Sequence, residues 1–396
     1  MTRPPAHSEP ARYREVSAKS VTRLRGTVDP WFLGRYGMNL YRGCEHGCRY
    51  CDGRAERYYV DGDFDRDIVV KHNAVDVLRK ELGRAKEPGF VLVGGGVCDA
   101  YQPAEAKYRL ARGALELALE FGFPVHVLTK SSLVERDLDL LAQINRRARA
   151  ILSFSIQTTN DDVRARFEPG AAAIAERLRL MREARRLGLG VGAMAMPVLP
   201  GISDQPDSID RLVETAVAAG ADFVCTGGLT LRPGAQKDAY FALLRDQYPE
   251  LVDGYLRVYR SNRPSGIPDP RYLDRLERRF RAALLRHGIP SRPPHPLFRG
   301  LMPCYAEVGV RLEHQAVELC SQGRPGLSLG RAGFAIQAWA RDRISTLGRR
   351  KGFHHSHVEA EFRERLQDGS IAELLGLQRS ALQAARELCP RAGASE

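Results

Sequence analysis

The stretch Cys44-Glu45-His46-Gly47-Cys48-Arg49-Tyr50-Cys51 holds three cysteines in the spacing C-x3-C-x2-C. A closed zinc or iron–sulfur site takes four protein ligands, so a tight triplet predicts a four-iron cluster in which one iron stays open. Gly47 allows the tight turn that three converging thiolates require. The spacing therefore predicts a metal centre that can bind a substrate or cofactor directly.

Two other interpretations of the triplet are ordinary buried cysteines and half of a zinc site. Buried cysteines do not usually cluster so tightly along the chain. A zinc site needs a fourth ligand, and the nearby His46 lies at a poor position for it. The iron–sulfur interpretation is therefore favoured.

Composition is that of a globular protein, because 43% of the 396 residues are hydrophobic and 27% are charged. The N-terminus lacks the apolar core of a signal peptide, and no stretch is long enough to span a membrane. Eight cysteines spread over this length do not resemble the dense disulfide framework of a small secreted domain. We therefore expect a cytoplasmic protein without a membrane partner.

Apolar runs and amphipathic stretches alternate from residue 65 to about residue 230, which predicts a parallel sheet wrapped by helices. The expected strands are Phe90–Val93, Val125–Leu128, Ala150–Ile156, Gly190–Met196 and Asp222–Cys225, together with one before the cysteine triplet. The clearest helical patterns between them are 104–121, 137–148 and 172–187. Six strands are too few for a closed eight-stranded barrel. Functional residues in such folds gather at the carboxyl ends of the strands.

Helical patterns replace this alternation after Gly234. They cover 238–247, 272–287, 307–320, 334–347 and 358–387, and proline-rich breaks separate them. We expect a flexible segment over residues 1–30, the sheet-containing unit over 31–235 and a mainly helical region over 236–396.

The triplet resembles the radical S-adenosylmethionine (radical SAM) superfamily, whose defining motif has this spacing. Downstream, Gly94 to Pro103, Lys130 and Phe167-Glu168-Pro169-Gly170 resemble the spore photoproduct lyase family, a lyase family related to DNA repair. The resemblance implies an α/β fold, an open six-stranded (β/α)6 partial TIM barrel with a helical C-terminal extension. It also implies a 4Fe–4S cluster on Cys44, Cys48 and Cys51 that cleaves S-adenosylmethionine to a 5′-deoxyadenosyl radical.

The same resemblance implies cofactor-binding residues. Lys130 after the third strand and Ser155 on the fourth match family residues that contact the cofactor, and a lysine can pair with its carboxylate. Asp99 and Tyr101 match the turn after the second strand. Met196 matches the fifth strand near the adenine. A surface lysine and a core methionine are the plain alternatives for Lys130 and Met196.

Two positions depart from the family pattern. Spore lyases quench their product radical with a cysteine where this chain has Gly96, and carry a radical-relay tyrosine where it has Asp52. Cys98 lies two residues after Gly96, on the same face if the strand is extended, and Tyr50 precedes Cys51. Cys98 and Tyr50 are therefore the candidate catalytic residues that pass a hydrogen atom. The alternative for Cys98 is that it takes no part in the reaction.

Positive charge is concentrated between Leu256 and Gly300, where 11 arginines face three acidic residues. Such a stretch favours a phosphate backbone, although a solvated helix face would look the same. We therefore expect a damaged or modified base of DNA or RNA as the substrate. The alternatives are radical SAM modification of a peptide or small metabolite, and a non-catalytic iron–sulfur sensor that binds nucleic acid. A reductant such as flavodoxin or ferredoxin is the expected electron donor.

Overall fold

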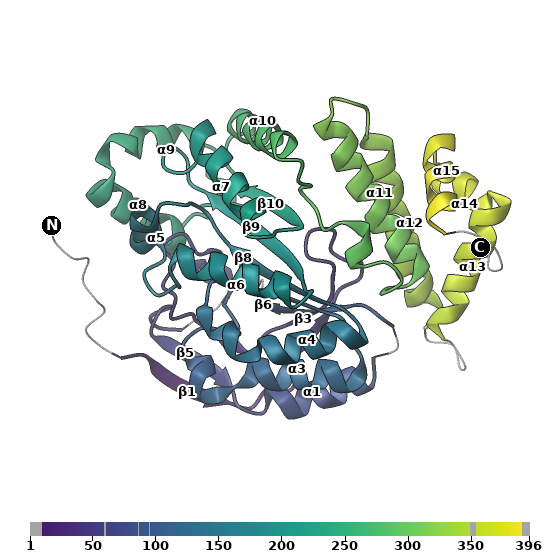
Figure 1. Ribbon diagram of the computed structural model, residues 1–396, viewed down its shortest axis with the longest axis horizontal. Helices are drawn as coiled ribbons and strands as arrows, with labels where there is room; N and C mark the ends of the chain where they lie inside the picture. The colour runs from purple at the N-terminus through teal and green to yellow at the C-terminus, as the bar shows by residue number, and fades with distance from the viewer. Residues whose placement is uncertain (1–9, 59–60, 86, 95, 349–353, 390–396) are drawn as a thin grey trace.

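The computed structural model describes residues 10–58, 61–85, 87–94, 96–348 and 354–389. A seven-stranded sheet with the order β10-β9-β8-β7-β6-β3-β2 lies at its centre (Figure 1). All neighbouring strands from β3 to β10 are parallel, while β2 runs antiparallel to β3. The strands are β2 (Thr22–Leu24), β3 (Gly34–Met38), β6 (Phe90–Gly94), β7 (Val125–Thr129), β8 (Ala150–Ser155), β9 (Gly190–Val198) and β10 (Phe223–Gly228).

The six parallel strands confirm the predicted α/β fold with an open sheet. Their limits differ from the predicted ones by a few residues, because a strand end is defined by backbone pairing and not by hydrophobicity. Helices fill the connections between them: α1 (Ala74–Gly83), α2 (Ala104–Tyr108), α3 (Leu110–Phe121), α4 (Leu138–Arg147), α5 (Asp161–Phe167), α6 (Ile174–Arg186) and α7 (Pro206–Ala218). Short 3-10 turns add η1 (Asp52–Arg54), η2 (Glu56–Tyr58) and η3 (Ser132–Asp137).

Alternate residues of each strand enter two different hydrophobic cores. Leu152 and Phe154 of β8 pack in the core that includes α3, α4 and α6, whereas Ile151 packs with Met194 and Phe223 in another. We call the face that carries Ile151 the inner face. The six described residues of β8 are all buried, as expected for a parallel strand that is covered on both faces.

A helical C-terminal region follows the sheet, as predicted. It contains α8 (Ala235–Gln247), η4 (Pro249–Leu251), α9 (Val252–Val258), α10 (Pro270–Arg286), η5 (His295–Leu297), α11 (Cys304–Ser321), α12 (Leu327–Leu347), α13 (His355–Asp368), α14 (Ser370–Leu375) and α15 (Arg379–Leu388). The single helix expected over 358–387 is three helices, because Gly369 and Gly376 adopt left-handed backbone conformations at their ends. A disulfide joins Cys304 to Cys389.

The N-terminal segment corrects one prediction. Residues 12–24 contribute β2 to the main sheet and β1 (Arg12–Val16) to a second sheet of order β1-β5-β4, with β5 (Asp67–Lys71) and β4 (Tyr41–Arg42). The flexible segment predicted over residues 1–30 is therefore wrong for this part, since its backbone is paired with other strands. Residues 1–9 lie outside the described residues. In the part of the chain that the structure describes, no helix has the length and apolar character to cross a membrane.

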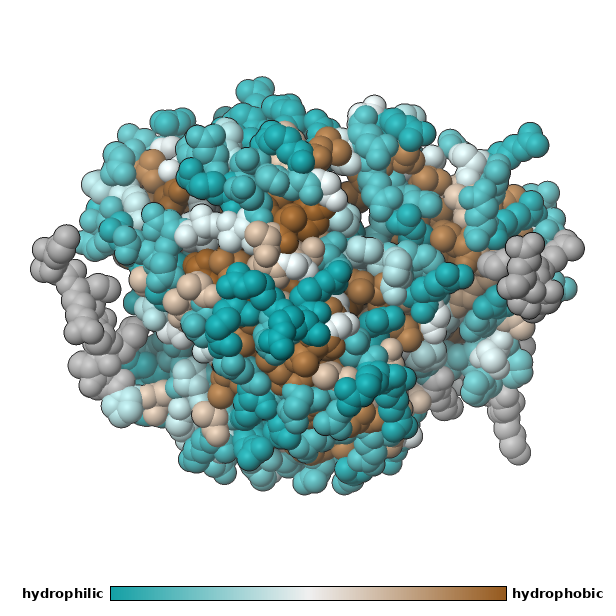
Figure 2. All heavy atoms as spheres, viewed as in Figure 1, coloured by the Kyte–Doolittle hydropathy of each residue, from teal (hydrophilic) through white to brown (hydrophobic). Residues whose placement is uncertain are grey.

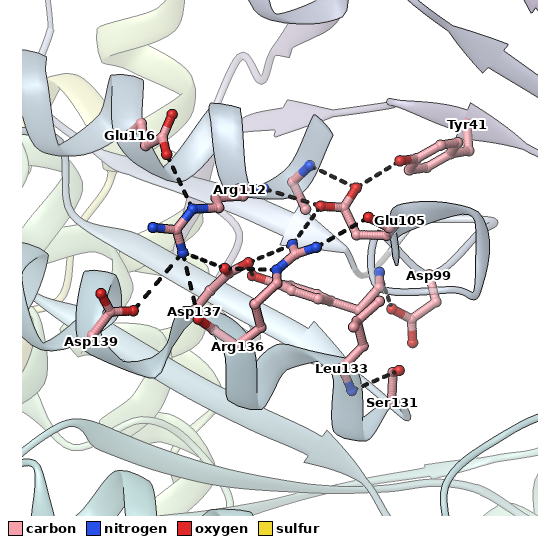
Figure 3. A network of polar contacts seen from close by, with 12 residues as sticks. Tyr41, Asp99, Glu105, Arg112, Glu116, Ser131, Leu133, Arg136, Asp137 and Asp139 are labelled. Carbon is pink, nitrogen blue, oxygen red and sulfur yellow. Dashed lines mark hydrogen bonds and ion pairs between the residues drawn. The ribbon is translucent and has the colours of Figure 1, made fainter. Parts of the chain in front are cut away.

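The helix predicted over 104–121 is broken at Arg109, whose φ is +53°. The buried Glu105 carboxylate causes the break, since it accepts hydrogen bonds from the backbone N–H groups of Ala111 and Arg112 at 3.0 and 3.2 Å and so caps the start of α3. It also accepts from the Tyr41 hydroxyl at 2.6 Å and pairs with Arg136 at 2.8 Å (Figure 3). Sequence patterns do not contain this distant pairing.

Asp137 completes the network of Figure 3. Its carboxylate accepts from Arg112 at 2.7 Å and from Arg136 at 2.8 Å, and its side chain is fully buried. The network joins α2, α3 and the start of α4, and so holds together the connections that follow β6 and β7.

Replacing Asp137 with alanine should lower the free energy of unfolding by about 3 kcal/mol, because two arginines lose a shared buried carboxylate. Asp139→Ala is the matched control: its carboxylate lies 3.9 Å from Arg112 and is 65% exposed, so the free energy should hardly change. Urea denaturation followed by circular dichroism measures both variants. Equal losses in the two would contradict this account of the network.

Candidate functional site

The three cysteines lie on one loop between β4 and η1. None of them forms a disulfide; Cys44 and Cys48 are buried and Cys51 is partly buried. Gly47 has φ +61°, and its N–H donates to the carbonyl oxygen of Cys44 at 3.1 Å, while Cys51 N–H donates to that of Cys48 at 3.2 Å. Two successive turns therefore place three free thiols close together on one short loop.

Three free thiols on one loop are a donor set that fits a 4Fe–4S cluster, in which each thiolate binds a different iron. Within the described ranges, no group of three His, Cys, Asp or Glu side chains that could hold a metal ion is found. Burial raises the pKa of the Cys48 thiol to about 12, and the nearby Lys130 ammonium acts in the opposite direction. Iron binding would therefore release thiol protons.

A second segment packs against the cysteine loop. The N–H of Arg49 donates to the carbonyl oxygen of Phe167 at 2.8 Å, and the N–H of Gly170 donates to that of His46 at 3.0 Å. A Cβ atom on Gly170 would lie only 2.3 Å from the carbonyl oxygen of Glu45, so only glycine permits this approach. Residues 167–170 thus hold the loop from one side.

Glu168 lies within this segment and is fully buried. It accepts a short hydrogen bond from the Tyr50 hydroxyl and pairs with Arg177 Nη2 at 2.6 Å; the Arg177 side chain is also fully buried. Arg177 Nη1 donates to the carbonyl oxygen of Ser155 at 2.7 Å. This chain of contacts ties the cysteine loop to the end of β8.

Sequence reasoning missed the roles of Glu168 and Arg177. One signal was present: Arg177 occupies a core position of α6, between Ile174 and Leu180. An arginine there predicts a buried acidic partner. Burial acts to raise the pKa of Glu168, but Arg177 and Lys130 outweigh it and lower that pKa, so the carboxylate is ionised at neutral pH.

Lys130 directly follows β7 and lies beside the cysteine loop. Its Nζ atom is 5.9 Å from the centre of the Tyr50 ring. Burial acts to lower its pKa, but Cys48 and Glu168 prevail and raise it, so the side chain carries a positive charge. The structure thus brings the predicted lysine next to the predicted cluster ligands.

Ser155 and Met196 lie on the inner face near the carboxyl ends of β8 and β9. Ser155 pairs in register with Met194, and Met196 lies two residues beyond, on the same side of β9. A Cβ atom on Gly227 would lie 3.3 Å from that of Met196, so β10 approaches closely here. Both residues thus lie at strand ends of the same face, and their contacts with a cofactor stay predictions.

Asp99 and Tyr101 are occupied in other contacts. The Asp99 carboxylate accepts from the Tyr101 N–H, the Thr129 hydroxyl and the Lys130 N–H, each at 2.8 Å, and lies 3.4 Å from His46. The Tyr101 side chain is fully buried, and its hydroxyl donates to Asp137 at 3.2 Å. Both residues position the loops at the sheet edge, and this geometry gives no support to a direct cofactor contact by either side chain.

Cys98 does not lie where the sequence places it. The prediction that it shares the face of Gly96 assumed an extended strand, but β6 ends at Gly94 and bends follow. Its thiol donates to the carbonyl oxygen of Tyr41 at 3.1 Å, and its side chain packs against the core that contains Leu152 and Phe154. No atom lies within 4 Å of a Cβ built on Gly96, while Gly95 lies outside the described residues. The Cys98 thiol also interacts electrostatically with the thiols of Cys44 and Cys51, so it lies near the cysteine loop, and its role as a hydrogen-atom donor stays a prediction.

Replacing Arg177 with methionine should lower the free energy of unfolding by about 3–5 kcal/mol, because it leaves the Glu168 carboxylate buried without its partner. Arg179→Met is the control on the same helix, since the Arg179 side chain is 42% exposed and pairs with acids at the surface. Urea denaturation of the metal-free protein measures both. If the two variants are equally stable, Glu168 does not depend on Arg177.

Comparisons with known proteins agree with this geometry. The model of the family described as Radical SAM superfamily matches residues 38–216. The uncharacterized protein Rv2578c of Mycobacterium tuberculosis is 34% identical over 268 residues, which cover 66% of this chain and 78% of that protein. A protein of Pseudomonas phage M6 named radical SAM Nalpha-GlyT isomerase is 29% identical over 186 residues, which cover 46% of this chain and 36% of the phage protein.

Among solved structures, a cysteine-to-alanine mutant of spore photoproduct lyase with a dinucleoside spore photoproduct is similar in fold. The TM-score is 0.50 and the identity 19%, and the match covers 69% of this chain and 79% of the lyase. At this identity the similarity concerns the fold alone. The family model, the related mycobacterial protein and the open parallel sheet together show that this chain belongs to the radical SAM superfamily.

Proposed function

We propose that this chain is an enzyme that holds a 4Fe–4S cluster on Cys44, Cys48 and Cys51 and cleaves S-adenosylmethionine reductively. The observation that carries the proposal is the loop of three free thiols beside Lys130, in a chain of this superfamily. When bound and reduced, the cluster supplies the electron that splits the cofactor into methionine and a 5′-deoxyadenosyl radical. A one-electron donor such as flavodoxin or ferredoxin would reduce it.

The protein's own side chains bind and orient the cofactor in this proposal. The Lys130 ammonium attracts the carboxylate of S-adenosylmethionine, and the Ser155 hydroxyl offers a hydrogen bond at the neighbouring strand end. Met196 packs near the adenine. Tyr50 and Cys98 both remain candidates for passing a hydrogen atom: the Tyr50 hydroxyl donates to Glu168, and the Cys98 thiol donates to the carbonyl oxygen of Tyr41. The buried pair of Glu168 and Arg177 keeps Tyr50 and the cysteine loop in place.

We further propose a damaged or modified nucleic-acid base as the substrate. The fold similarity to spore photoproduct lyase and the arginines of the α10 region support this choice. Several of these arginines pair with acids, for example Arg278 with Asp274 and Arg286 with Asp210. Others, such as Arg271 and Arg299, pair with no acidic side chain among the described contacts and stay available for phosphate groups.

Cys48→Ala should abolish both the visible absorbance of the reconstituted cluster and the formation of 5′-deoxyadenosine, because one iron loses its ligand. Cys320→Ala is the control, since Cys320 is a free cysteine outside the loop, and it should retain both. Anaerobic reconstitution, reduction and chromatography of the products measure the effect. A Cys48→Ala protein that keeps full cluster absorbance and full cleavage of S-adenosylmethionine would contradict the assignment of Cys48 as a cluster ligand.

The substrate is tested in the same assay with duplex DNA that carries thymine photoproducts. Deoxyadenosine together with reversal of the lesion supports the proposed substrate class. Deoxyadenosine without reversal keeps the chemistry and rejects this lesion. An intact cluster that yields no deoxyadenosine with several reductants favours the sensor interpretation instead.

A further inference from the structure

A large cavity lies outside the cysteine loop, between α10 and the pair α11 and α12. Its volume is about 1050 Å³, and β10 residues Thr226, Gly227 and Gly228 form part of its lining. Figure 2 shows hydrophobic residues at the surface where Figure 1 places α10 beside α11. The volume is at the upper end of the range for small-molecule sites, which are mostly apolar with a few polar groups.

The cavity exposes apolar side chains to water. Leu285 of α10 and Leu327 and Phe334 of α12 line it, with exposed fractions of 55%, 72% and 62%. Single exposed apolar residues are common, but three around one cavity favour a ligand with an apolar body.

Arg292 lines the same cavity and supplies a positive charge. Its guanidinium lies 3.5 Å from the centre of the Trp31 ring, and Nη1 donates to the carbonyl oxygen of Ser291 at 2.8 Å. A guanidinium has five N–H donors, and no acidic side chain forms an ion pair with this one among the described residues. Of the two acids in the lining, Glu318 pairs with Arg311 at 2.9 Å, and Glu277 of α10 interacts with Arg292 electrostatically without forming an ion pair.

Burial lowers the pKa of Arg292, whereas the Cys225 thiol and the carboxylates of Asp29 and Glu277 raise it, so part of its charge is compensated. Arg281 and Arg331 also line the cavity, so three arginines stand against two glutamates and the lining carries an excess of positive charge.

We propose that this cavity binds an amphipathic anion, a molecule with an apolar body and one carboxylate, sulfonate or phosphate group. The body packs among Phe280, Leu284 and Phe334, and the anionic group accepts hydrogen bonds from Arg292. An anion here gains a charge-assisted hydrogen bond beside a lining with an excess of positive charge. The proposal does not depend on the function proposed above.

A nucleobase fits this lining less well than an amphipathic anion. The edges of a base carry several hydrogen-bond donors and acceptors, and unpaired polar groups in an apolar pocket lower affinity. Most side chains of α10 and α12 that line the cavity are leucine and phenylalanine, and the charged ones are Glu277, Arg281 and Arg331. The lining therefore favours an aliphatic or aromatic body with a single charged end.

Dodecanoate and dodecan-1-ol test the proposal, because they share one apolar body and differ in charge. Calorimetry with the full chain should show one dodecanoate site, with an affinity about ten-fold higher than for dodecanol. Arg292→Gln should remove this preference and leave the dodecanol affinity unchanged. Arg324→Gln is the matched control, an exposed arginine between α11 and α12 that does not line the cavity, and it should keep the preference.

A second measurement uses the unmodified chain, so it tests the proposal even if the Arg292→Gln variant folds poorly. Cys320 is a free cysteine in the cavity lining, so dodecanoate should slow its alkylation by iodoacetamide, as read from its peptide by mass spectrometry. Equal affinity for the two probes, an unchanged preference in Arg292→Gln or unprotected Cys320 would overturn the proposal. So would displacement of dodecanoate by a single-stranded oligonucleotide, which would assign the cavity to nucleic acid.

Discussion

The buried ion pair between Glu168 and Arg177 is the contact on which the geometry of the site depends. Both side chains are removed from water, and each also bonds to a different part of the fold: Glu168 to Tyr50 of the cysteine loop and Arg177 to the backbone of Ser155. A buried charge is tolerated only when it is paired and hydrogen-bonded, so the pair constrains every element that it touches. The cysteine loop has little regular structure of its own and is held by these contacts.

A second network of buried carboxylates fixes the neighbouring strand ends and the helices that follow them. Asp99 links the connection after β6 to the end of β7, while Glu105 and Asp137 join the helices that follow these strands. The carboxyl ends of β6, β7 and β8 are therefore held by acidic side chains, of which Glu105, Asp137 and Glu168 are fully buried and Asp99 is partly exposed. Proposed cofactor residues Lys130 and Ser155 sit directly on this rigid edge, which suits a site that must hold its ligand in one orientation.

Much of the fold could be predicted from the sequence, because hydrophobic periodicity is a local property. The strands β6 to β9 and the helices α4 and α6 follow apolar patterns within single segments. The features that local patterns did not predict depend on distant partners. The predicted helix over 104–121 breaks at Arg109 because the carboxylate of Glu105 caps α3, and a disulfide joins Cys304 to a cysteine 85 residues away.

In the candidate site, too, local patterns predict some features, whereas others depend on distant contacts. The cysteine spacing predicts the loop, and strand alternation places Ser155 and Met196 on one face. Alternation failed for Cys98, because the backbone leaves the extended conformation at Gly94, and it could not reveal Glu168 as the partner of Arg177. Local patterns thus predict which residues reach the site, whereas the polar contacts that hold them require the folded chain.

The most direct test of the account is a Mössbauer spectrum of the ⁵⁷Fe-reconstituted protein with and without S-adenosylmethionine. Three cysteine ligands leave one iron of the cluster without a protein ligand, so the account predicts that the cofactor changes the signal of that iron and leaves the others unaltered. A spectrum that S-adenosylmethionine does not change, from a fully loaded cluster, would contradict the claim that this loop builds an open iron site.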